Sequence, residues 1–288
     1  MSAFSPRQIL CPLDLSPASE GVLRWAGLFA EAFGSHLDII HADWSEAPYF
    51  FTQGQIGELV AEAAHHRKTL SHHLHHLATK VLGSRVPFKT SVLDGSAVDI
   101  ILAYIRQSPP DLIVTGSQGR SGFDRLLLGS VAENVARHAI CPTLIVKGSV
   151  IPSDQHAIRS ILCPAALSDT AQHSISIAAD VSAAFRSDLS VLHIVEHNVL
   201  PPEDAREHLC QLVPAEVRNR CHVKEIVGSG NPAEQIILHA RSEHPDLIVL
   251  GSPQRSFLEF NTLGRTTERV LRHGPSPVLL IPYRTSGH

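Results

Sequence analysis

The sequence has few charged residues, and their charges nearly cancel. Asp, Glu, Lys and Arg make up 18% of the 288 residues, and the formal net charge is −4 with histidine neutral. A protein that holds nucleic acid through its phosphates needs a marked excess of positive charge. We therefore expect no nucleic-acid partner.

Long apolar runs and paired cysteine motifs are also missing. No apolar run approaches the roughly 20 residues of a membrane span, and the first residues lack the apolar core of a signal peptide. The five cysteines are scattered without a C-x-x-C motif, which indicates neither a disulfide framework nor a zinc ribbon. Cys11 and Cys163 lie in apolar runs and are expected to be buried thiols. These features favour a cytoplasmic protein without a membrane partner.

The chain contains two copies of one unit. The segment Ile9-Leu-Cys-Pro12 recurs at 161–164, and Asp111-Leu-Ile-Val-Thr-Gly-Ser117 recurs with one change at 246–252. The second pair of matching segments lies closer together in the sequence than the first pair, so the second copy lacks residues in its middle. A polar stretch separates the copies, and we expect domains at 1–148 and 158–288.

Each copy alternates strand and helix patterns. In the first, strands are expected at 8–13, 36–41, 87–93, 111–115 and 143–147, and helices at 16–33, 56–81, 98–107 and 130–138. Ser16 is a good N-cap for the first helix, and Gly34 is expected to end it in the left-handed conformation. Short apolar strands suit a sheet that is covered on both faces. The prediction is an α/β protein of two tandem doubly wound units, each an open five-stranded, mostly parallel sheet with helices on both faces.

The second expected helix has an apolar stripe and a face rich in histidine. The stripe, predicted to face the core, consists of Ile56, Leu59, Val60, Ala63, Leu70, Leu74, Leu77 and Val81. His72 and His76 are one helical turn apart, so their rings can share a metal such as zinc. An exposed polar face is the favoured interpretation, because no nearby Cys or Asp completes a tetrahedral set, although Glu62 could help. Histidines also titrate near neutral pH, which leaves pH sensing open.

A glycine motif follows the fourth expected strand. It reads Gly116-Ser-Gln-Gly119, then nine residues, then Gly129-Ser130, and it leads directly into a helix. Glycines allow a backbone to approach a bulky anion, and a helix N-terminus directs N–H groups and a positive dipole at it. The motif therefore predicts a phosphate site, most simply that of a nucleotide. The alternatives are ordinary loop glycines, a helix-capping role for Ser130, and a turn role for Asp14 after the first strand.

The motif and the following Cys141-Pro-Thr-Leu-Ile-Val146 resemble the universal stress protein family, over nearly the whole chain. The resemblance implies a cytoplasmic stress-response or regulatory protein that binds ATP or another adenine nucleotide, with Mg²⁺ as a companion of the phosphates. It also implies that the last strands of the two units pair edge to edge as an internal pseudo-dimer, with a homodimer as a further option. The implied nucleotide-binding residues are Pro12, Asp14, Ala42, Gly116, Gln118, Gly119, Gly129, Ser130 and Val131.

The second copy departs from this pattern. Ala166 occupies the position equivalent to Asp14, Gln254 the position equivalent to Gly119, and Arg265 the position equivalent to Ser130. We therefore expect the second unit to bind nucleotide weakly or not at all and to be mainly structural. A rival hypothesis is that Arg255 and Arg265 serve some other anion.

No catalytic residues are predicted. The sequence shows no defensible nucleophile–base pair and no paired carboxylates in the glycine loop, where metal-assisted phosphoryl transfer would need them. Two alternatives stay open: an enzyme that uses or slowly hydrolyses ATP, and a metal- or pH-responsive interaction protein centred on the histidine-rich helix.

Overall fold

Strands and helices alternate along both units of the chain. The computed structural model describes residues 3–44, 53–118, 128–147, 158–196, 201–254 and 263–284. The first unit contains β1 (Gln8–Pro12), α1 (Ser19–Phe33), β2 (His36–Asp43), α2 (Gln53–Leu82), β3 (Phe88–Asp94), α3 (Ala97–Gln107), β4 (Leu112–Gly116), α4 (Ser130–His138) and β5 (Thr143–Val146). The second unit contains β6 (Ser160–Pro164), α5 (Asp169–Phe185), β7 (Asp188–Val195), α6 (Pro202–Leu212), α7 (Ala215–Arg220), β8 (Val223–Ser229), α8 (Pro232–Glu243), β9 (Leu247–Gln254), α9 (Arg265–His273) and β10 (Val278–Arg284).

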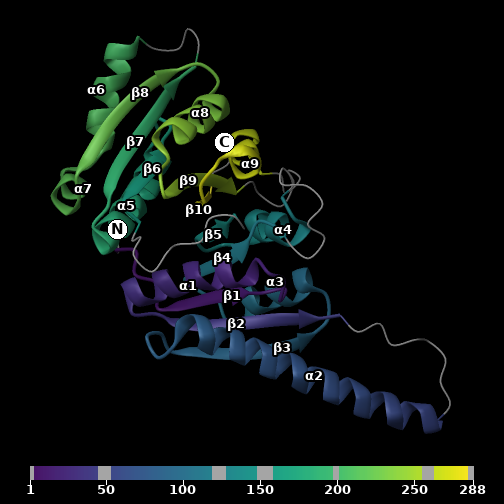
Figure 1. The fold of residues 1–288 in the computed structure, drawn as a ribbon. Helices are drawn as coiled ribbons and strands as arrows, with labels where there is room; N and C mark the ends of the chain where they lie inside the picture. Colours follow the sequence, from purple (N-terminus) through teal and green to yellow (C-terminus); the bar gives the residue numbers. More distant parts are fainter. Residues whose placement is uncertain are drawn as a thin grey trace.

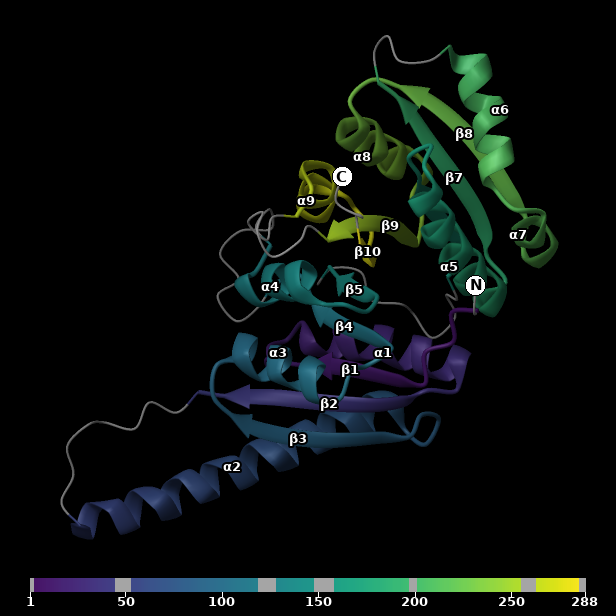
Figure 2. The same ribbon diagram turned by 180° about the vertical axis from the view of Figure 1, so that it is seen from behind.

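All ten of these strands form one sheet, in the order β3-β2-β1-β4-β5-β10-β9-β6-β7-β8. Every neighbouring pair within a unit is parallel, and only β5 and β10 run antiparallel, with Leu144 opposite Leu279. Figures 1 and 2 show this sheet crossing from the first unit to the second through β5 and β10. The predicted α/β class is confirmed, and the last strands pair as expected.

Helices cover both faces of the sheet. In β1, Ile9 and Cys11 pack in the core beneath α1 and α2, whereas Leu10 between them packs in the core beneath α3 and α4. In the second unit α5, α6 and α7 lie on the first of these faces, and α8 and α9 on the other. Successive side chains of a strand point to opposite faces, so a strand that is covered twice must be apolar throughout.

The two units also meet beside the strands that join them. Ala132 of α4 belongs to the same buried cluster as Val270 and Leu271 of α9. At the end of β5, Lys147 donates a hydrogen bond to the carbonyl of Gly274, which follows the last residue of α9. The second unit thus covers the β5 edge and the adjoining helix of the first.

Two details of the predicted helices are wrong. Helix α1 begins at Ser19, not Ser16, and its N-cap residue is Ala18. The apolar stripe of α2 reaches the core only in its C-terminal half, where Leu74 and Val81 are buried, whereas Val60 is 63% exposed. In Figures 1 and 2 the N-terminal half of α2 projects beyond the sheet, so the described part of the chain offers it no core to join.

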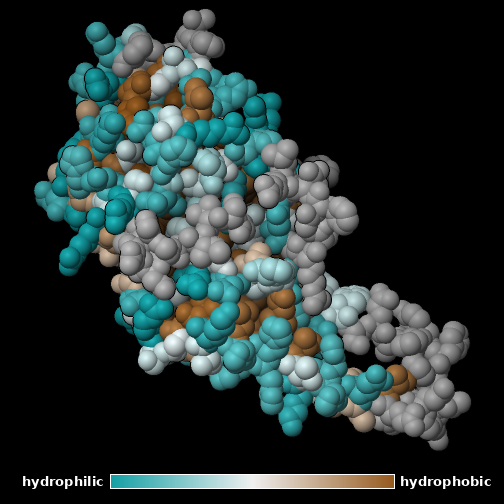
Figure 3. Space-filling model, viewed as in Figure 1, coloured by the Kyte–Doolittle hydropathy of each residue, from teal (hydrophilic) through white to brown (hydrophobic). Residues whose placement is uncertain are grey.

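The shorter second copy differs at the connection from β7 to β8, where the short helices α6 and α7 replace the long α2. On the face seen in Figure 3, the described residues are largely hydrophilic, with hydrophobic side chains in patches. Within the described ranges, none of the helices is both long enough and apolar enough to cross a lipid bilayer.

Candidate functional site

A cavity of about 210 Å³ lies in the first unit where β1 and β4 end and α4 begins. Open parallel sheets place ligands at this edge, beside the point where the strand order reverses. The cavity is lined by Pro12, Leu13, Asp14, Ser16, Ala18, Ser19, Val22, Ile40, His41, Ala42, Ala97, Ile101, Thr115, Gly116, Gln118, Gly129, Ser130, Val131 and Ala132. Eight of the nine predicted binding residues are among them. The ninth, Gly119, lies outside the described residues.

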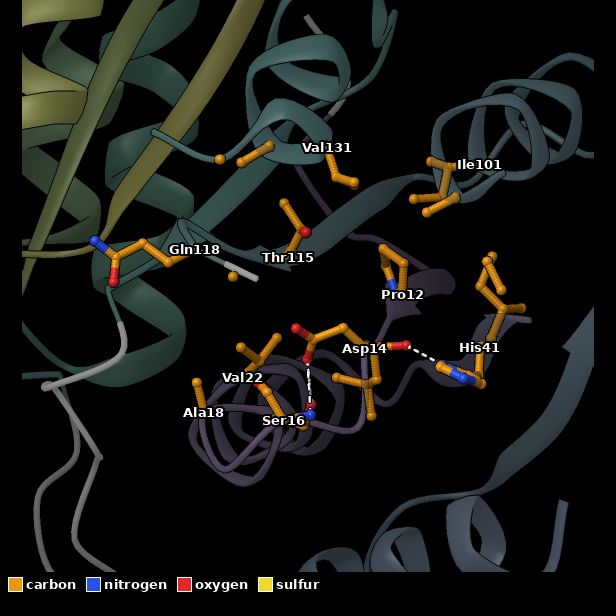
Figure 4. A pocket seen from close by; sticks show the side chains of 18 of the residues that line it. Pro12, Asp14, Ser16, Ala18, Val22, His41, Ile101, Thr115, Gln118 and Val131 are labelled. Carbon is orange, nitrogen blue, oxygen red and sulfur yellow. Dashed lines mark hydrogen bonds between the residues drawn. The ribbon is translucent and has the colours of Figure 1, made fainter. Parts of the chain in front are cut away.

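Asp14 holds a turn with one carboxylate oxygen and leaves the other without a partner. Its Oδ1 accepts hydrogen bonds from the Ser16 amide at 3.0 Å and from Ser19 Oγ at 2.9 Å. Its Oδ2 is buried and has no hydrogen-bond partner among the described residues. Figure 4 shows the side chain pointing into the cavity toward Thr115. A buried acceptor without a donor costs about 1–3 kcal/mol, so this oxygen is a candidate acceptor for a ligand hydroxyl or amine.

The turn after β1 also explains why Ser16 does not cap α1. The Asp14 carboxylate takes the Ser16 amide, and the Ser16 carbonyl accepts from the Ser19 amide at 2.9 Å. Leu15 between them has a φ of 58°, which is unfavourable for a residue with a branched side chain. Backbone strain of this kind persists where neighbouring bonds hold it, and it gathers at functional sites.

The glycines at the opposite wall have two different roles. A Cβ added at Gly116 would lie 3.2 Å from Val22 Cγ2, so this glycine lets the end of β4 approach α1. Gly129 has extended backbone angles and is the N-cap of α4, and its amide donates to the Ser117 carbonyl at 2.8 Å. The Gly129 amide is therefore already used and is not available to a phosphate.

Ser130 does not cap α4, since it is the first residue of the helix. It lies in the helical turn whose backbone amides have no acceptor within the helix, together with Val131 and Ala132. A helix start of this kind attracts an anion through its N–H groups and its dipole. The described part of the predicted phosphate site is thus the first turn of α4.

The predicted second strand ends just before Ala42, but the observed strand includes this residue. It is inside β2, where it pairs with Leu93 of β3, because the parallel ladder continues to Asp43. It still lines the cavity. With Ile40, Ala97 and Ile101 it forms an apolar wall on the β2 and α3 side.

His41 is a site residue that the sequence interpretation missed. The ring is 5% exposed, and Nδ1 lies 2.7 Å from the carbonyl oxygen of Leu13. A carbonyl can only accept, so Nδ1 carries the hydrogen. The repeat could have revealed His41, because a histidine, His193, occupies the equivalent position in the second unit. Its Nδ1 lies 2.9 Å from the Ala165 carbonyl oxygen.

The buried cysteines are unreactive rather than catalytic. Cys11 and Cys163 are fully buried, as predicted, and Cys141 is nearly so. Burial raises the pKa of the Cys163 and Cys141 thiols to about 12 and raises that of Cys11 further. A thiol with such a pKa holds its proton at neutral pH and is a poor nucleophile.

The predicted metal pair shows little support from its surroundings. His72 and His76 are exposed on α2. Nowhere in the described ranges do three His, Cys, Asp or Glu side chains gather as a metal site requires. A zinc site there would need a ligand from elsewhere.

Comparison with known proteins agrees with the repeat and the sheet. The family model of the universal stress protein family matches residues 6–147 and again 157–282. A universal stress protein of Mycobacterium tuberculosis is 27% identical, with 97% of each chain covered. A universal stress protein from Archaeoglobus fulgidus shares the fold with a TM-score of 0.68 at 21% identity, over 96% of this chain and 98% of that one. A functionally unknown protein from Pseudomonas aeruginosa does so with a TM-score of 0.62 at 19% identity, over 96% and 93%. The chain belongs to the universal stress protein family, as a tandem of two such units.

Proposed function

We propose that the first unit binds ATP, or another adenine nucleotide with its Mg²⁺, and that the chain serves as a cytoplasmic stress-response regulator. The proposal places the nucleotide in the domain 1–148 and treats 158–288 as a second domain that binds no nucleotide. One observation carries it: the buried Oδ2 of Asp14, without a partner among the described residues, faces the cavity that ends at α4.

The lining of the cavity matches the three parts of a nucleotide. Asp14 supplies an acceptor for ribose hydroxyls, and the first turn of α4 supplies donors for a phosphate. The apolar wall of Ile40, Ala42, Ala97 and Ile101 suits the face of a base. In Figure 4, Asp14 lies between Gln118 on one side and Pro12, His41 and Ile101 on the other. A residue that binds the sugar needs this middle position, because the sugar of a nucleotide joins the base to the phosphates.

The second unit lacks the carboxylate in this arrangement, because Ala166 occupies the frame of Asp14. Its contribution to nucleotide binding is therefore indirect: β10 pairs with β5 and covers the edge of the first unit's sheet.

Calorimetric titration of the full chain with ATP tests the proposal. We expect about one ATP per chain. Asp14→Asn keeps an oxygen for Ser16 and Ser19 but replaces the unpartnered acceptor with a donor, and it should weaken binding at least about tenfold. Asp94→Asn removes an exposed carboxylate that does not line the cavity, and it should leave the affinity unchanged. A stoichiometry near two, or full affinity in Asp14→Asn, would overturn the assignment.

A further inference from the structure

The second unit has a cavity of its own at the equivalent place. It lies where β6 and β9 end and α9 begins, and its volume is about 430 Å³, compared with about 210 Å³ in the first unit. Nucleotide binding by the first unit gives this cavity no role.

At three positions its lining has an apolar group or a cation where the first unit has an oxygen acceptor. Ala166 replaces Asp14, Leu250 replaces Thr115, and Arg265 replaces Ser130 at the first position of the helix. The first two changes remove the Asp14 carboxylate and the Thr115 hydroxyl, two oxygens of the first cavity that could bind a sugar hydroxyl. The third adds a full positive charge to the positive end of α9, which strengthens the attraction for an anion.

A buried serine is an independent sign of a ligand. Ser174 of α5 lines the cavity, is only 2% exposed, and its Oγ has no hydrogen-bond partner among the described residues. In the first unit the same frame holds Val22, an apolar residue. A hydroxyl that is buried without a partner destabilises a protein by about 1–3 kcal/mol, so its presence points to a ligand that completes it.

The backbone leaves room for this hydroxyl. A Cβ added at Gly251 would lie 2.7 Å from Ser174 Oγ and 3.2 Å from Cε1 of Tyr283, whose ring forms another part of the wall. Any side chain at Gly251 would fill this corner of the cavity.

The charges at the two ends of the cavity differ in sign. Arg265 is exposed at the start of α9, and no ion pair joins it to a described carboxylate. The next arginine along the helix, Arg269, is engaged with Glu234 at 3.0 Å. Glu196 lies at the end of β7, two strands from β9, and disfavours a second anion there. A ligand that fits carries one anionic group toward α9 and an apolar body toward Leu250, Ile236 and Ile194.

We propose that the second unit binds a small amphipathic organic anion, a carboxylate or a phosphate monoester with an apolar body, with its charge at Arg265 and the start of α9 and a hydrogen bond to Ser174. The site is separate from the proposed nucleotide site and of a different specificity, so that one chain responds to two chemically distinct ligands.

Calorimetric titration of the full chain with phenyl phosphate and with octanoate, in saturating ATP, tests this proposal and separates the two kinds of anion. We expect about one molecule of at least one probe per chain. Arg265→Gln should weaken that binding at least about tenfold, because it removes a charge-assisted contact. Arg269→Gln, one turn further along the same helix, is the matched control and should bind as the unaltered chain does.

Ser174→Ala provides the second variant, since alanine fits wherever serine does. It should weaken probe binding while the chain without probe unfolds at the same temperature or higher. Repeating the titration in Asp14→Asn without ATP keeps the result independent of the nucleotide proposal. Absence of binding by both probes at millimolar concentration, binding unaffected by Arg265→Gln, or a second ATP that Arg265→Gln removes would each overturn the inference.

Discussion

His41 and Leu13 tie the ends of two neighbouring strands together: His41 Nδ1 lies 2.7 Å from the Leu13 carbonyl oxygen. The Leu13 amide in turn donates to the Ile40 carbonyl at 2.9 Å. These two bonds fix the point at which the chain leaves β1, one residue before Asp14. The position of the candidate site's carboxylate therefore depends on a buried histidine from the next strand.

Replacing His41 by leucine should destabilise the protein by about 1–3 kcal/mol, because the Leu13 carbonyl would lose its partner inside the protein. Urea unfolding measures the change. His36→Gln, on an exposed position of the same strand, should shift the free energy of unfolding by less than about 0.5 kcal/mol. Equal changes in the free energy of unfolding for the two substitutions would contradict a stabilising role for the buried hydrogen bond of His41. The His41 variant should also bind ATP more weakly, because the loop that carries Asp14 is less well held.

Asp14→Asn should stabilise the nucleotide-free protein, by about 1 kcal/mol, while impairing binding. The asparagine oxygen keeps the bonds to Ser16 and Ser19, and the variant no longer buries a charged oxygen without a donor. Thermal melting with and without ATP reads both effects. A nucleotide-free variant that melts well below the unaltered chain would show that Oδ2 already has a partner.

Lys147 should make stability rise with pH in the alkaline range. Burial, with help from the charge of Arg241, lowers the pKa of Lys147 to about 8 in the folded chain. Between about pH 8 and its ordinary pKa near 10.4, the unfolded chain holds a proton that the folded chain has released. Stability rises with pH wherever the unfolded state binds more protons, here by up to roughly 3 kcal/mol.

The Lys147→Met variant isolates this contribution, because all other groups titrate alike in both proteins. The urea unfolding free energy of the unaltered chain should rise relative to that of the variant as pH increases from 8 to 10. A difference that stays constant with pH would show that the ammonium is not buried against the second unit beside Gly274.

A chain cut after residue 150 should self-associate. The truncation uncovers the edge of β5, where Thr143, Leu144 and Ile145 now pair with β10. An uncovered apolar edge strand is a template for pairing with another copy. Size-exclusion chromatography checks the state, and ATP titration of the soluble fraction should still detect binding. A stable monomer contradicts the role given to the second unit.

Zinc should leave the melting temperature of the protein unchanged, since His72 and His76 are exposed without a third described ligand. A site that binds only the folded chain would raise the melting temperature as zinc is added. If such a rise occurs and His72→Ala with His76→Ala abolishes it, the exposed-face interpretation is wrong and the histidine pair is a site.

The repeat and the strand alternation could be predicted from the sequence itself, whereas the edge that joins the units was implied by the family resemblance. Apolar periodicity and the recurrence of Ile9-Leu-Cys-Pro12 are local signals, and strands that are buried on both faces leave few arrangements. The family resemblance, carried by the glycine spacing, implied which residues gather around one cavity. The repeat and the strand alternation depend on the local order of residues, which contacts between distant segments do not alter.

Other features depend on contacts between segments far apart in sequence, and only the tertiary structure decided them. The stripe of α2 was regular along its length, yet the sheet ends before its first half, so Val60 stays exposed while Leu74 is buried. Ser16 had the chemistry of a helix cap, but the turn held by Asp14 places the first helical residue at Ser19. The unpartnered atoms that carry both proposals, Asp14 Oδ2 and Ser174 Oγ, are defined by what surrounds them. A sequence specifies which groups are polar, and only the folded chain determines which of them lack a partner.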